Sequence, residues 1–354
     1  MRNFLITGGC GFVGSSLALS LKAKDPTRRV LALDNLKRRG SELNLPRLKA
    51  AGVEFVHGDI RNQEDLEAVG EVDLLLECSA EPSVLAGLTG SPAYVINTNL
   101  MGTLNCLELA RQRNAAFLFF STSRVYPMAG LGEVKLTERT TRFELDEVQD
   151  QPGLSGKGVS ESYGLEGARS IYGATKLASE LMIHEYVEAF GLKALINRCG
   201  VLTGPWQFGK QDQGVVVLWA ARHHFEGKLG YFGYGGEGKQ VRDILHVQDL
   251  YRLVELQLGR LDQWRGQVYN VGGGREVSVS LAELTALCQA ATGKKIPLGS
   301  VPENRVADIP LYLTDNSKVT AATGWRPQIG PEQIVNEIAL WIKNNETLLA
   351  GVLQ

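Results

Sequence analysis

Short apolar runs alternate with helical patterns through the first two hundred residues of the chain. The strand-like runs are "FLIT", "RVLALD", "VEFVHGD", "VDLLLECSA", "AFLFFSTS" and "KALINR". Several of them are apolar without alternation, as expected for parallel strands that are covered on both faces. The segments "GSSLALSLKAK", "NTNLMGTLNCLELARQ" and "SIYGATKLASELMIHEYVEAFG" lie between them and are helix candidates. This order predicts an α/β fold of the Rossmann type, with a doubly wound parallel sheet.

The character of the chain changes after Arg198. Gly, Pro and aromatic residues dominate "GVLTGPWQFGKQDQG" and "LGYFGYGGEGKQ", and two further helical patterns follow, "SLAELTALCQAATG" and "PEQIVNEIALWIKNN". We therefore predict a Rossmann domain over residues 1–197, to which a segment near 240–272 returns. A smaller C-terminal substrate-binding region is expected over 198–354. The polar, Gly-containing stretch 127–158 is expected to be a lid or a surface excursion.

Composition and charge exclude several classes of function. The chain has 354 residues, 44% hydrophobic and 21% charged, with a formal charge of −2. This balance is typical of a soluble globular protein, and it favours neither nucleic acid nor a membrane as a partner. No apolar stretch is long enough to cross a bilayer, and no signal peptide is expected because a strand-like run begins at Phe4. Five widely spaced Cys and five His without metal-ligand spacing predict reduced thiols, no metal site and a cytoplasmic protein.

A glycine-rich segment, "ITGGCGFVGSS", joins the first predicted strand to the first predicted helix. Its Gly8, Gly11 and Gly14 form the pattern G-x-x-G-x-x-G. Glycines permit a tight turn and a close approach of backbone N–H groups to a pyrophosphate, which the helix N-terminus also attracts. A three-glycine pattern alone is weak evidence, and a Gly-rich turn without a ligand is the alternative. The placement between strand and helix favours dinucleotide binding.

The end of the second strand indicates which dinucleotide is bound. "RVLALD" ends at Asp34, twenty residues after the last glycine, where a carboxylate can accept both ribose hydroxyls and repel a 2′-phosphate. This favours NAD over NADP. Lys37, Arg38 and Arg39 follow and could attract a phosphate, but we interpret them as a solvated basic loop. Asp59 follows the third strand, and on sequence alone it is as much a turn residue as an adenine ligand.

Tyr172 is the only one of ten Tyr residues with a Lys four positions later, at Lys176. That spacing is about one helical turn, so both side chains share a face. A free phenol has a pKa of about 10, and a nearby ammonium lowers it. With a nicotinamide site supported, Tyr172 would take a proton from a sugar hydroxyl while Lys176 binds the ribose. A surface pair is the alternative interpretation. Ser121, Thr122 and Ser123 end the fifth strand and are candidates for a second donor.

Taken together, "GGCGFVG", Asp34, "HGDI", "STSRVY", "YGATK" and "VRDILH" resemble the extended short-chain dehydrogenase/reductases, nearly end to end. The resemblance implies tightly held NAD, a nucleotide-sugar substrate and a catalytic triad of Thr122, Tyr172 and Lys176. Thr122 is assigned because it precedes the x-x-Val-Tyr of "TSRVY". We also expect a homodimer or homotetramer. The implied cofactor-binding residues are Gly8, Gly11, Phe12, Val13, Gly14, Asp34, Asn35, Asp59, Ile60, Ser79, Ala80, Asn99, Tyr172 and Lys176.

The residues after Thr122 separate two reactions within that family. The sugar 4,6-dehydratases carry Asp-Glu at these positions, which supply the acid and the base that dehydration needs. Here the positions are Ser123 and Arg124, and neither is a carboxylic acid. The resemblance therefore implies epimerisation, in which hydride leaves a sugar carbon and returns to its other face.

Within the family, the motifs are most similar to those of the CDP-paratose (CDP-tyvelose) 2-epimerases. These motifs are "ITGGCGFVGSSLA", "FVHGDIRN", "STSRVYP", "GKQVRDILH" and "QFGKQDQGVV". The similarity implies a CDP-sugar that is oxidised at C2. Arg242 and Arg305 would hold the diphosphate, although either could form an ordinary surface salt bridge instead. The implied substrate-binding residues are Ser123, Arg124, Cys199, Gln207, Gln240, Arg242 and Arg305.

Two carboxylates depart from the family pattern. Many relatives have His at the position of Glu77 and a small residue or Gln near Glu81, and either carboxylate could pair with an Arg or contact a sugar hydroxyl. The sugar stays open between CDP-paratose, CDP-glucose and a UDP-sugar. The alternative functions are a UDP-sugar 4-epimerase, a nucleotide-sugar reductase or dehydratase, and a non-catalytic NAD(P)-sensing regulator. Such regulators typically lack the Tyr-x-x-x-Lys pair, which this chain has.

Overall fold

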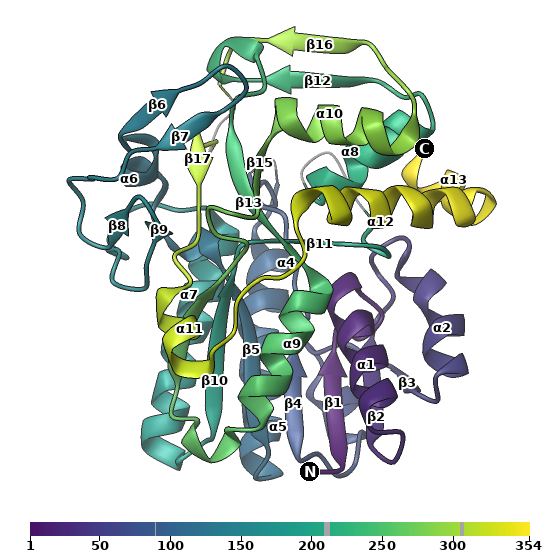
Figure 1. Ribbon diagram of the computed structural model, residues 1–354. Helices are drawn as coiled ribbons and strands as arrows, with labels where there is room; N and C mark the ends of the chain where they lie inside the picture. The colour runs from purple at the N-terminus through teal and green to yellow at the C-terminus, as the bar shows by residue number, and fades with distance from the viewer. Residues whose placement is uncertain (89, 209–212, 305–307) are drawn as a thin grey trace. The chain divides into compact units, whose positions relative to one another are not determined.

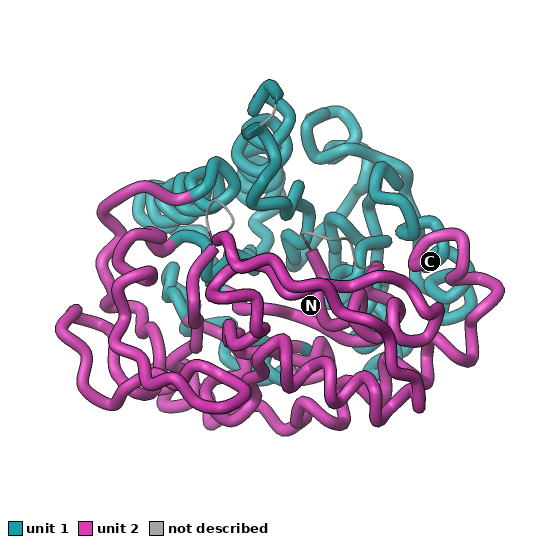
Figure 2. The backbone as a smooth tube through the Cα atoms, turned by 90° about the horizontal axis from the view of Figure 1, so that it is seen from above, with its two compact units in different colours: residues 1–125, 170–198, 251–269 teal, residues 126–169, 199–250, 270–354 magenta. Residues whose placement is uncertain are grey.

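The computed structural model describes residues 1–88, 90–208, 213–304 and 308–354. The chain forms two compact units, shown in two colours in Figure 2. Unit 1 comprises residues 1–125, 170–198 and 251–269, and unit 2 comprises 126–169, 199–250 and 270–354. The predicted division into an NAD-binding domain over residues 1–197 and a substrate-binding region over 198–354 stays a prediction.

A seven-stranded sheet in the order β14-β10-β5-β4-β1-β2-β3 forms the centre of the Rossmann fold. The pairings from β5 through β4, β1 and β2 to β3 are all parallel. The predicted α/β fold with a doubly wound parallel sheet is therefore confirmed. The strand order reverses between β1 and β4, and in such sheets ligands bind at that point, at the carboxyl ends of the strands. The strands are β1 (Asn3–Thr7), β2 (Arg29–Asp34), β3 (Glu54–His57), β4 (Leu74–Glu77), β5 (Ala116–Thr122), β10 (Ala194–Cys199) and β14 (Gln267–Val271).

Helices cover both faces of this sheet, which explains why its strands are apolar without alternation. Leu5, Leu75 and Phe117 belong to a core cluster with residues of α5 and α7. Phe4 and Ile6 are buried as well, and they point to the opposite face because successive strand residues alternate. Figure 1 shows α1 and α9 in front of the sheet. The helices between the strands are α1 (Phe12–Lys24), η1 (Ser41–Asn44), α2 (Leu45–Ala50), α3 (Gln63–Glu67), α4 (Ala93–Ile96), η2 (Asn97–Met101), α5 (Gly102–Gln112), η3 (Ser123–Val125), α7 (Ile171–Phe190), α9 (Val247–Leu258) and η5 (Leu261–Gln263).

Helix α7 has well-defined ends. Ser170 caps its N-terminus by accepting a hydrogen bond from the Gly173 N–H at 3.1 Å. Gly191 ends the helix with a φ of 67°, a left-handed conformation that glycine adopts without strain. The cap fixes the first turn of the helix, where Tyr172 lies.

Unit 2 consists of small sheets and helices. β11, β13 and β15 form a sheet in that order, and β17 pairs with β13. The polar stretch 127–158 contributes α6, the β6–β7 hairpin and part of the β8–β9 pair. The elements are α6 (Met128–Gly132), β6 (Leu136–Glu138), β7 (Phe143–Leu145), β8 (Leu154–Ser155), β9 (Gly158–Val159), β11 (Val201–Thr203), α8 (Val215–His224), β12 (Leu229–Phe232), η4 (Tyr234–Gly236), β13 (Val241–His246), β15 (Ser278–Ser280), α10 (Leu281–Thr292), β16 (Leu298–Val301), β17 (Leu311–Tyr312), α11 (Ser317–Thr323), α12 (Pro331–Asn344) and α13 (Glu346–Leu353).

A buried carboxylate joins three segments of unit 2. Asp243 of β13 is fully buried and accepts hydrogen bonds from the N–H groups of Gly274 at 3.0 Å and Thr314 at 3.2 Å. Burial raises the pKa of Asp243 to about 6. The carboxylate therefore holds the segments of Gly274 and Thr314 against β13 through backbone hydrogen bonds.

The cysteines of the chain, all of them among the described residues, form no disulfides. All five Cys are free, and four of them are buried. Across the described ranges, no group of three or more His, Cys, Asp or Glu side chains is placed to hold a metal ion. No helix in those same ranges combines the length and the apolar character that a membrane span requires.

Candidate active site

The glycine-rich segment forms a closed loop between β1 and α1. The Gly11 N–H donates to the Gly8 carbonyl at 2.9 Å. A Cβ added to Gly14 would lie 2.2 Å from the Gly8 oxygen, and one added to Gly8, at a φ of +61°, would lie 2.8 Å from the Cys78 oxygen. Neither position can therefore carry a side chain without moving backbone. Phe12 opens α1, so its first turn presents unpaired N–H groups, which suit an anion.

Asp34 ends β2 beside this loop. One carboxylate oxygen accepts from the Cys10 N–H at 3.0 Å, and the other accepts from the Leu36 N–H at 2.8 Å. Burial raises the pKa of Asp34, and the N–H groups of Leu36, Cys10 and Gly11 oppose that rise. Asp34 thus supports the glycine loop directly. Its predicted contact with the adenosine ribose stays a prediction.

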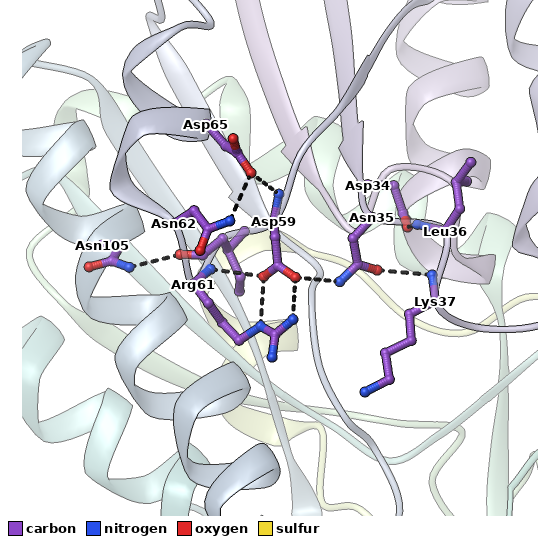
Figure 3. A network of polar contacts seen from close by, with 10 residues as sticks. Asp34, Asn35, Leu36, Lys37, Asp59, Arg61, Asn62, Asp65 and Asn105 are labelled. Carbon is purple, nitrogen blue, oxygen red and sulfur yellow. Dashed lines mark hydrogen bonds and ion pairs between the residues drawn. The ribbon is translucent and has the colours of Figure 1, made fainter.

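Figure 3 shows the polar network that continues from Asp34 to the end of β3. Asp59 accepts two hydrogen bonds from the Arg61 guanidinium, at 2.9 and 2.6 Å, and one from the Asn35 amide at 2.8 Å. These contacts, those of Arg61 above all, hold the pKa of Asp59 well below its usual range. The Asn35 oxygen in turn accepts from the Lys37 N–H at 3.0 Å. Asp59 therefore organises this turn, and its contact with adenine stays a prediction.

The basic loop after Asp34 is less free than its sequence indicates. The Lys37 ammonium lies 3.1 Å from the centroid of the Tyr94 ring, and the Arg61 guanidinium lies 5.1 Å from the same ring. Lys37 is exposed, yet this cation–π contact directs its charge toward Tyr94. The interpretation of Lys37 as purely solvated is therefore incomplete.

Asn99 links the loop after β4 to α7. Its side-chain oxygen accepts from the Glu81 N–H at 2.8 Å, and its amide donates to the Glu81 carbonyl at 3.1 Å and to the Thr175 hydroxyl at 3.3 Å. Asn99 lies in the π-helical turn η2, a local irregularity that is often found at functional sites. Ser79 and Ala80 directly precede Glu81. The Ser79 nitrogen lies 2.9 Å from the position that a Cβ on Gly8 would take. The structure therefore places Ser79 beside the glycine loop and ties Asn99 to Glu81 in the segment that follows.

Ile60 differs from the other predicted cofactor residues. Its side chain is 4% exposed and belongs to the core cluster on the α5 face of the sheet. Its carbonyl accepts from the Asn105 amide at 2.9 Å. Its side chain thus has a packing role, and its contact with the cofactor stays a prediction.

The predicted triad lies at the carboxyl end of β5 and at the start of α7. Thr122 is the last residue of β5 and is 8% exposed, whereas Tyr172 is 9% exposed and Lys176 is 2% exposed. Tyr172 and Lys176 are one turn apart in the first two turns of α7, which packs on β5. The Lys176 ammonium lies 3.7 Å from the Glu77 carboxylate and 3.8 Å from the centroid of the Phe119 ring. Burial of this pair excludes the interpretation as an exposed surface pair.

A buried ion pair next to the triad was not predicted. The Arg198 guanidinium donates to Oε1 of Glu180 at 3.1 Å and to Oε2 at 3.0 and 2.6 Å, and the Ser121 hydroxyl also donates to that carboxylate. Glu180 lies one turn after Lys176 on α7, and Ser121 directly precedes Thr122. The network therefore ties α7 to the end of β5. The sequence held one sign of this ion pair. Arg198 lies within the apolar run "ALINRC", and a charge in a buried strand needs a partner of opposite charge.

The predicted substrate residue Gln240 lines a cavity of about 650 Å³ in unit 2. Its amide donates to the Phe232 carbonyl at 2.5 Å. Its side-chain oxygen is buried and accepts no hydrogen bond from the described residues. Trp219 and Asp308 also line the cavity. Its volume is in the range of sites for small organic ligands.

The other predicted substrate residues of unit 2 have partners within the protein. Arg242 pairs with Asp308 at 2.9 Å and donates to the Ile309 carbonyl at 2.8 Å. Gln207 donates to the Leu202 carbonyl at 2.9 Å, and Cys199 is buried at the end of β10. Arg305 lies outside the described residues. In unit 1, Ser123 and Arg124 form the short helix η3 directly after Thr122.

Residues 4–272 match the NAD dependent epimerase/dehydratase family. CDP-paratose 2-epimerase from Salmonella typhi is 34% identical over 345 residues, which cover 95% of this chain and 98% of that protein. Two solved structures are similar along nearly the whole chain. A dTDP-glucose 4,6-dehydratase from Streptomyces venezuelae with NAD bound has a TM-score of 0.80 and 27% identity, and covers 99% of this chain and 100% of that one. A UDP-glucose 4-epimerase from Thermus thermophilus in complex with NAD has a TM-score of 0.77 and 26% identity, with 96% and 99% covered.

The chain belongs to the NAD-dependent epimerase/dehydratase family. The predicted resemblance to extended short-chain dehydrogenase/reductases, and to CDP-paratose 2-epimerase among them, is confirmed. The protein is an enzyme whose cofactor is NAD, and its relatives act on nucleotide sugars. The described residues fit NAD because the Gly8–Gly14 loop leaves no room for side chains and Asp34 lies beside it. A non-catalytic regulator is therefore no longer a competing function.

Proposed function

We propose that this protein is a nucleotide-sugar 2-epimerase that acts on a CDP-sugar of the CDP-paratose/CDP-tyvelose type. The observation that carries the proposal is the buried set Thr122, Tyr172 and Lys176 at the carboxyl end of β5 and the start of α7. Ser123 and Arg124 follow Thr122, so the positions that supply the acid and base of a 4,6-dehydratase hold no carboxylate. The similarity to CDP-paratose 2-epimerase favours C2 and a CDP-sugar over the alternatives.

Each member of the set has a defined task in this proposal. Thr122 orients the sugar hydroxyl, and Tyr172 takes its proton and later returns it. The buried Lys176 ammonium stabilises the phenolate and holds the ribose of the cofactor. Bound NAD would supply the acceptor for the hydride of the sugar carbon, and the Gly8–Gly14 loop, Asp34 and Lys176 would hold it. Inversion then requires that the oxidised sugar present its other face before the hydride returns.

The cavity and the polar groups of unit 2 favour binding of the nucleoside diphosphate part of the substrate in this unit. The cavity that Gln240 lines is large enough for an organic ligand of this size class. Arg242 lies close to this cavity through its partner Asp308. A phosphate would compete with Asp308 for the guanidinium, and bidentate binding suits phosphate oxygens.

The test is a substrate deuterated at C2, incubated with the purified enzyme in ordinary water. A closed hydride cycle at C2 gives a product that keeps its deuterium at C2, without added NAD(P)H. Exchange of the label into solvent would overturn hydride return as the mechanism. Inversion at C4 instead would place the enzyme with the 4-epimerases, and net consumption of NADH would identify a reductase.

We further propose that the enzyme is a homodimer in the cytoplasm. The outer face of α7 exposes 60% of Leu181, and Met101 in the neighbouring turn η2 is 46% exposed. These are the apolar side chains on α7 and η2 that a second copy of this chain would cover. Five free thiols suit a reducing compartment. Light scattering should give the mass of a dimer for the wild type and of a monomer for Leu181→Glu, and a monomeric wild type would contradict the proposal.

A further inference from the structure

A carboxylate occupies an apolar position of the central sheet. Leu75 belongs to the core cluster on the face covered by α5 and α7, and Glu77, two residues later, points to the same face. Glu77 is 0% exposed. Its neighbour in the register of β1 is Thr7, which is also fully buried. A carboxylate in such a place is strongly unfavourable unless a cation or hydrogen-bond donors compensate it.

Lys176 is the group that compensates Glu77. Its ammonium lies 3.7 Å from one carboxylate oxygen. The Thr103 hydroxyl lies 3.5 Å from the same oxygen, but it donates its proton to the Asn99 carbonyl at 2.7 Å. The other oxygen of Glu77 has no hydrogen-bond partner among the described residues. The charge of Lys176 is therefore the largest stabilising effect on the carboxylate, and a hydrogen bond from the Ser79 N–H comes next.

The electrostatics of the surroundings agree with a coupled pair. Burial raises the pKa of Glu77, and the charge of Lys176 is the largest of the effects that oppose this rise. The charges of Glu77 and Lys176 also act on the thiol of Cys106 of α5. Burial, and next the charge of Glu77, hold the pKa of that thiol well above its usual range. Cys106 is therefore a neutral neighbour, and the charge balance concerns Glu77 and Lys176.

Phe119 and Glu77 both contact the Lys176 ammonium and together fix its position. The Phe119 ring lies 3.8 Å from the ammonium, and Glu77 lies on β4, the strand next to β5. We propose that Glu77 is a positioning residue, which holds the Lys176 ammonium at this place and sets how much of its charge acts on Tyr172. This inference rests on the proposed function, in which Tyr172 is the base and Lys176 its partner.

Removal of the Glu77 charge has a definite sign. A negative charge close to the pair favours the protonated form of both Lys176 and Tyr172, so its loss makes both groups release protons more easily. In a bell-shaped pH–rate profile, Tyr172 sets the acid limb and Lys176 the alkaline limb. Both limbs therefore move to lower pH in Glu77→Gln. An opposite charge at this distance shifts a titration by about 1–3 pH units, and we expect a displacement of that size for the alkaline limb.

The experiment compares four proteins: the wild type, Glu77→Gln, Glu77→Asp and Glu54→Gln. Glu77→Asp keeps the charge and should restore the wild-type limbs, even if its rate is lower. Glu54→Gln is the matched control, because Glu54 pairs with Arg29 at 3.0 Å in an exposed position where solvent screens it. Profiles of kcat against pH are measured with a CDP-sugar, and NAD content is measured for each protein. A lower rate with unshifted limbs in Glu77→Gln would show a packing role only and would overturn the inference.

A second readout does not depend on turnover. Lysine side chains labelled with 13C at Cε are titrated by NMR, and Lys176→Met identifies the signal of Lys176. Its midpoint should fall by about 1–3 pH units in Glu77→Gln and should return in Glu77→Asp. An unchanged midpoint would overturn the inference. If the midpoint falls but no nucleotide sugar is converted by the wild type, the proposed function fails while the coupling of Glu77 to Lys176 stands.

Discussion

The buried ion pair between Glu180 and Arg198 should be strongly cooperative. Its side chains are 2% and 6% exposed, and Arg198 donates to both oxygens of the carboxylate. Glu180→Leu leaves the guanidinium buried without its carboxylate, and Arg198→Met leaves the carboxylate buried without its cation. Breaking a buried pair from one side typically costs about 3–5 kcal/mol of unfolding free energy. We expect each single variant to lose this amount.

The double variant Glu180→Leu/Arg198→Met should lose much less than the sum of the two single losses. Apolar residues of similar volume often replace a buried ion pair at little cost. The Ser121 hydroxyl, which donates to Glu180, then loses its acceptor, and such a loss costs about 1–3 kcal/mol. The double variant should therefore be about 1–3 kcal/mol less stable than the wild type, with a coupling energy of at least about 3 kcal/mol between the two sites.

The assay is equilibrium unfolding in urea, followed by circular dichroism at one pH for all four proteins of the cycle. The midpoint and the slope together give the unfolding free energy of each protein. The turnover number of the double variant reports on geometry, since Ser121 adjoins Thr122 and Glu180 follows Lys176 by one turn. Additive losses in the double variant would refute the argument, because they would mean that the two charges do not compensate each other.

Three further predictions concern single residues. Tyr172→Phe should lower turnover by roughly 10²–10⁴-fold and leave NAD content unchanged, and a wild-type rate would remove Tyr172 from the mechanism. Asp34→Asn should reduce the preference for NAD over NADP by about tenfold in binding titrations, because the charge that repels a 2′-phosphate is gone; an unchanged preference would mean that Asp34 acts only on the glycine loop. Burial raises the pKa of Asp243 to about 6 from 3.8, so the folded state binds its proton more tightly than the unfolded state does. The stability of the wild type relative to Asp243→Asn should therefore fall by about 2.4 kcal/mol as the pH rises from 4 to 7, and a pH-independent difference in urea unfolding would contradict this.

The sequence was sufficient where the signal is local. The predicted strand "RVLALD" is β2, and the predicted helix "SIYGATKLASELMIHEYVEAFG" is α7 with its cap residues. The glycine spacing marked the loop between β1 and α1, since only glycine fits where an added Cβ would meet backbone at 2.2 Å. The spacing from Tyr172 to Lys176 placed both on one helical face, because a turn of helix is set by the backbone alone.

Only the tertiary structure decided which buried groups act on one another. Lys176 meets Glu77, ninety-nine residues earlier in the chain, because β4 and β5 are neighbours in the sheet and α7 packs on β5. Glu180 meets Ser121 and Arg198 for the same reason, since the ends of β5 and β10 adjoin. Residue types and periodicity predict that a charge in a buried strand needs a partner, but they do not say which one. Parallel strands bring distant segments together at one edge of the sheet, and the partner follows from that packing.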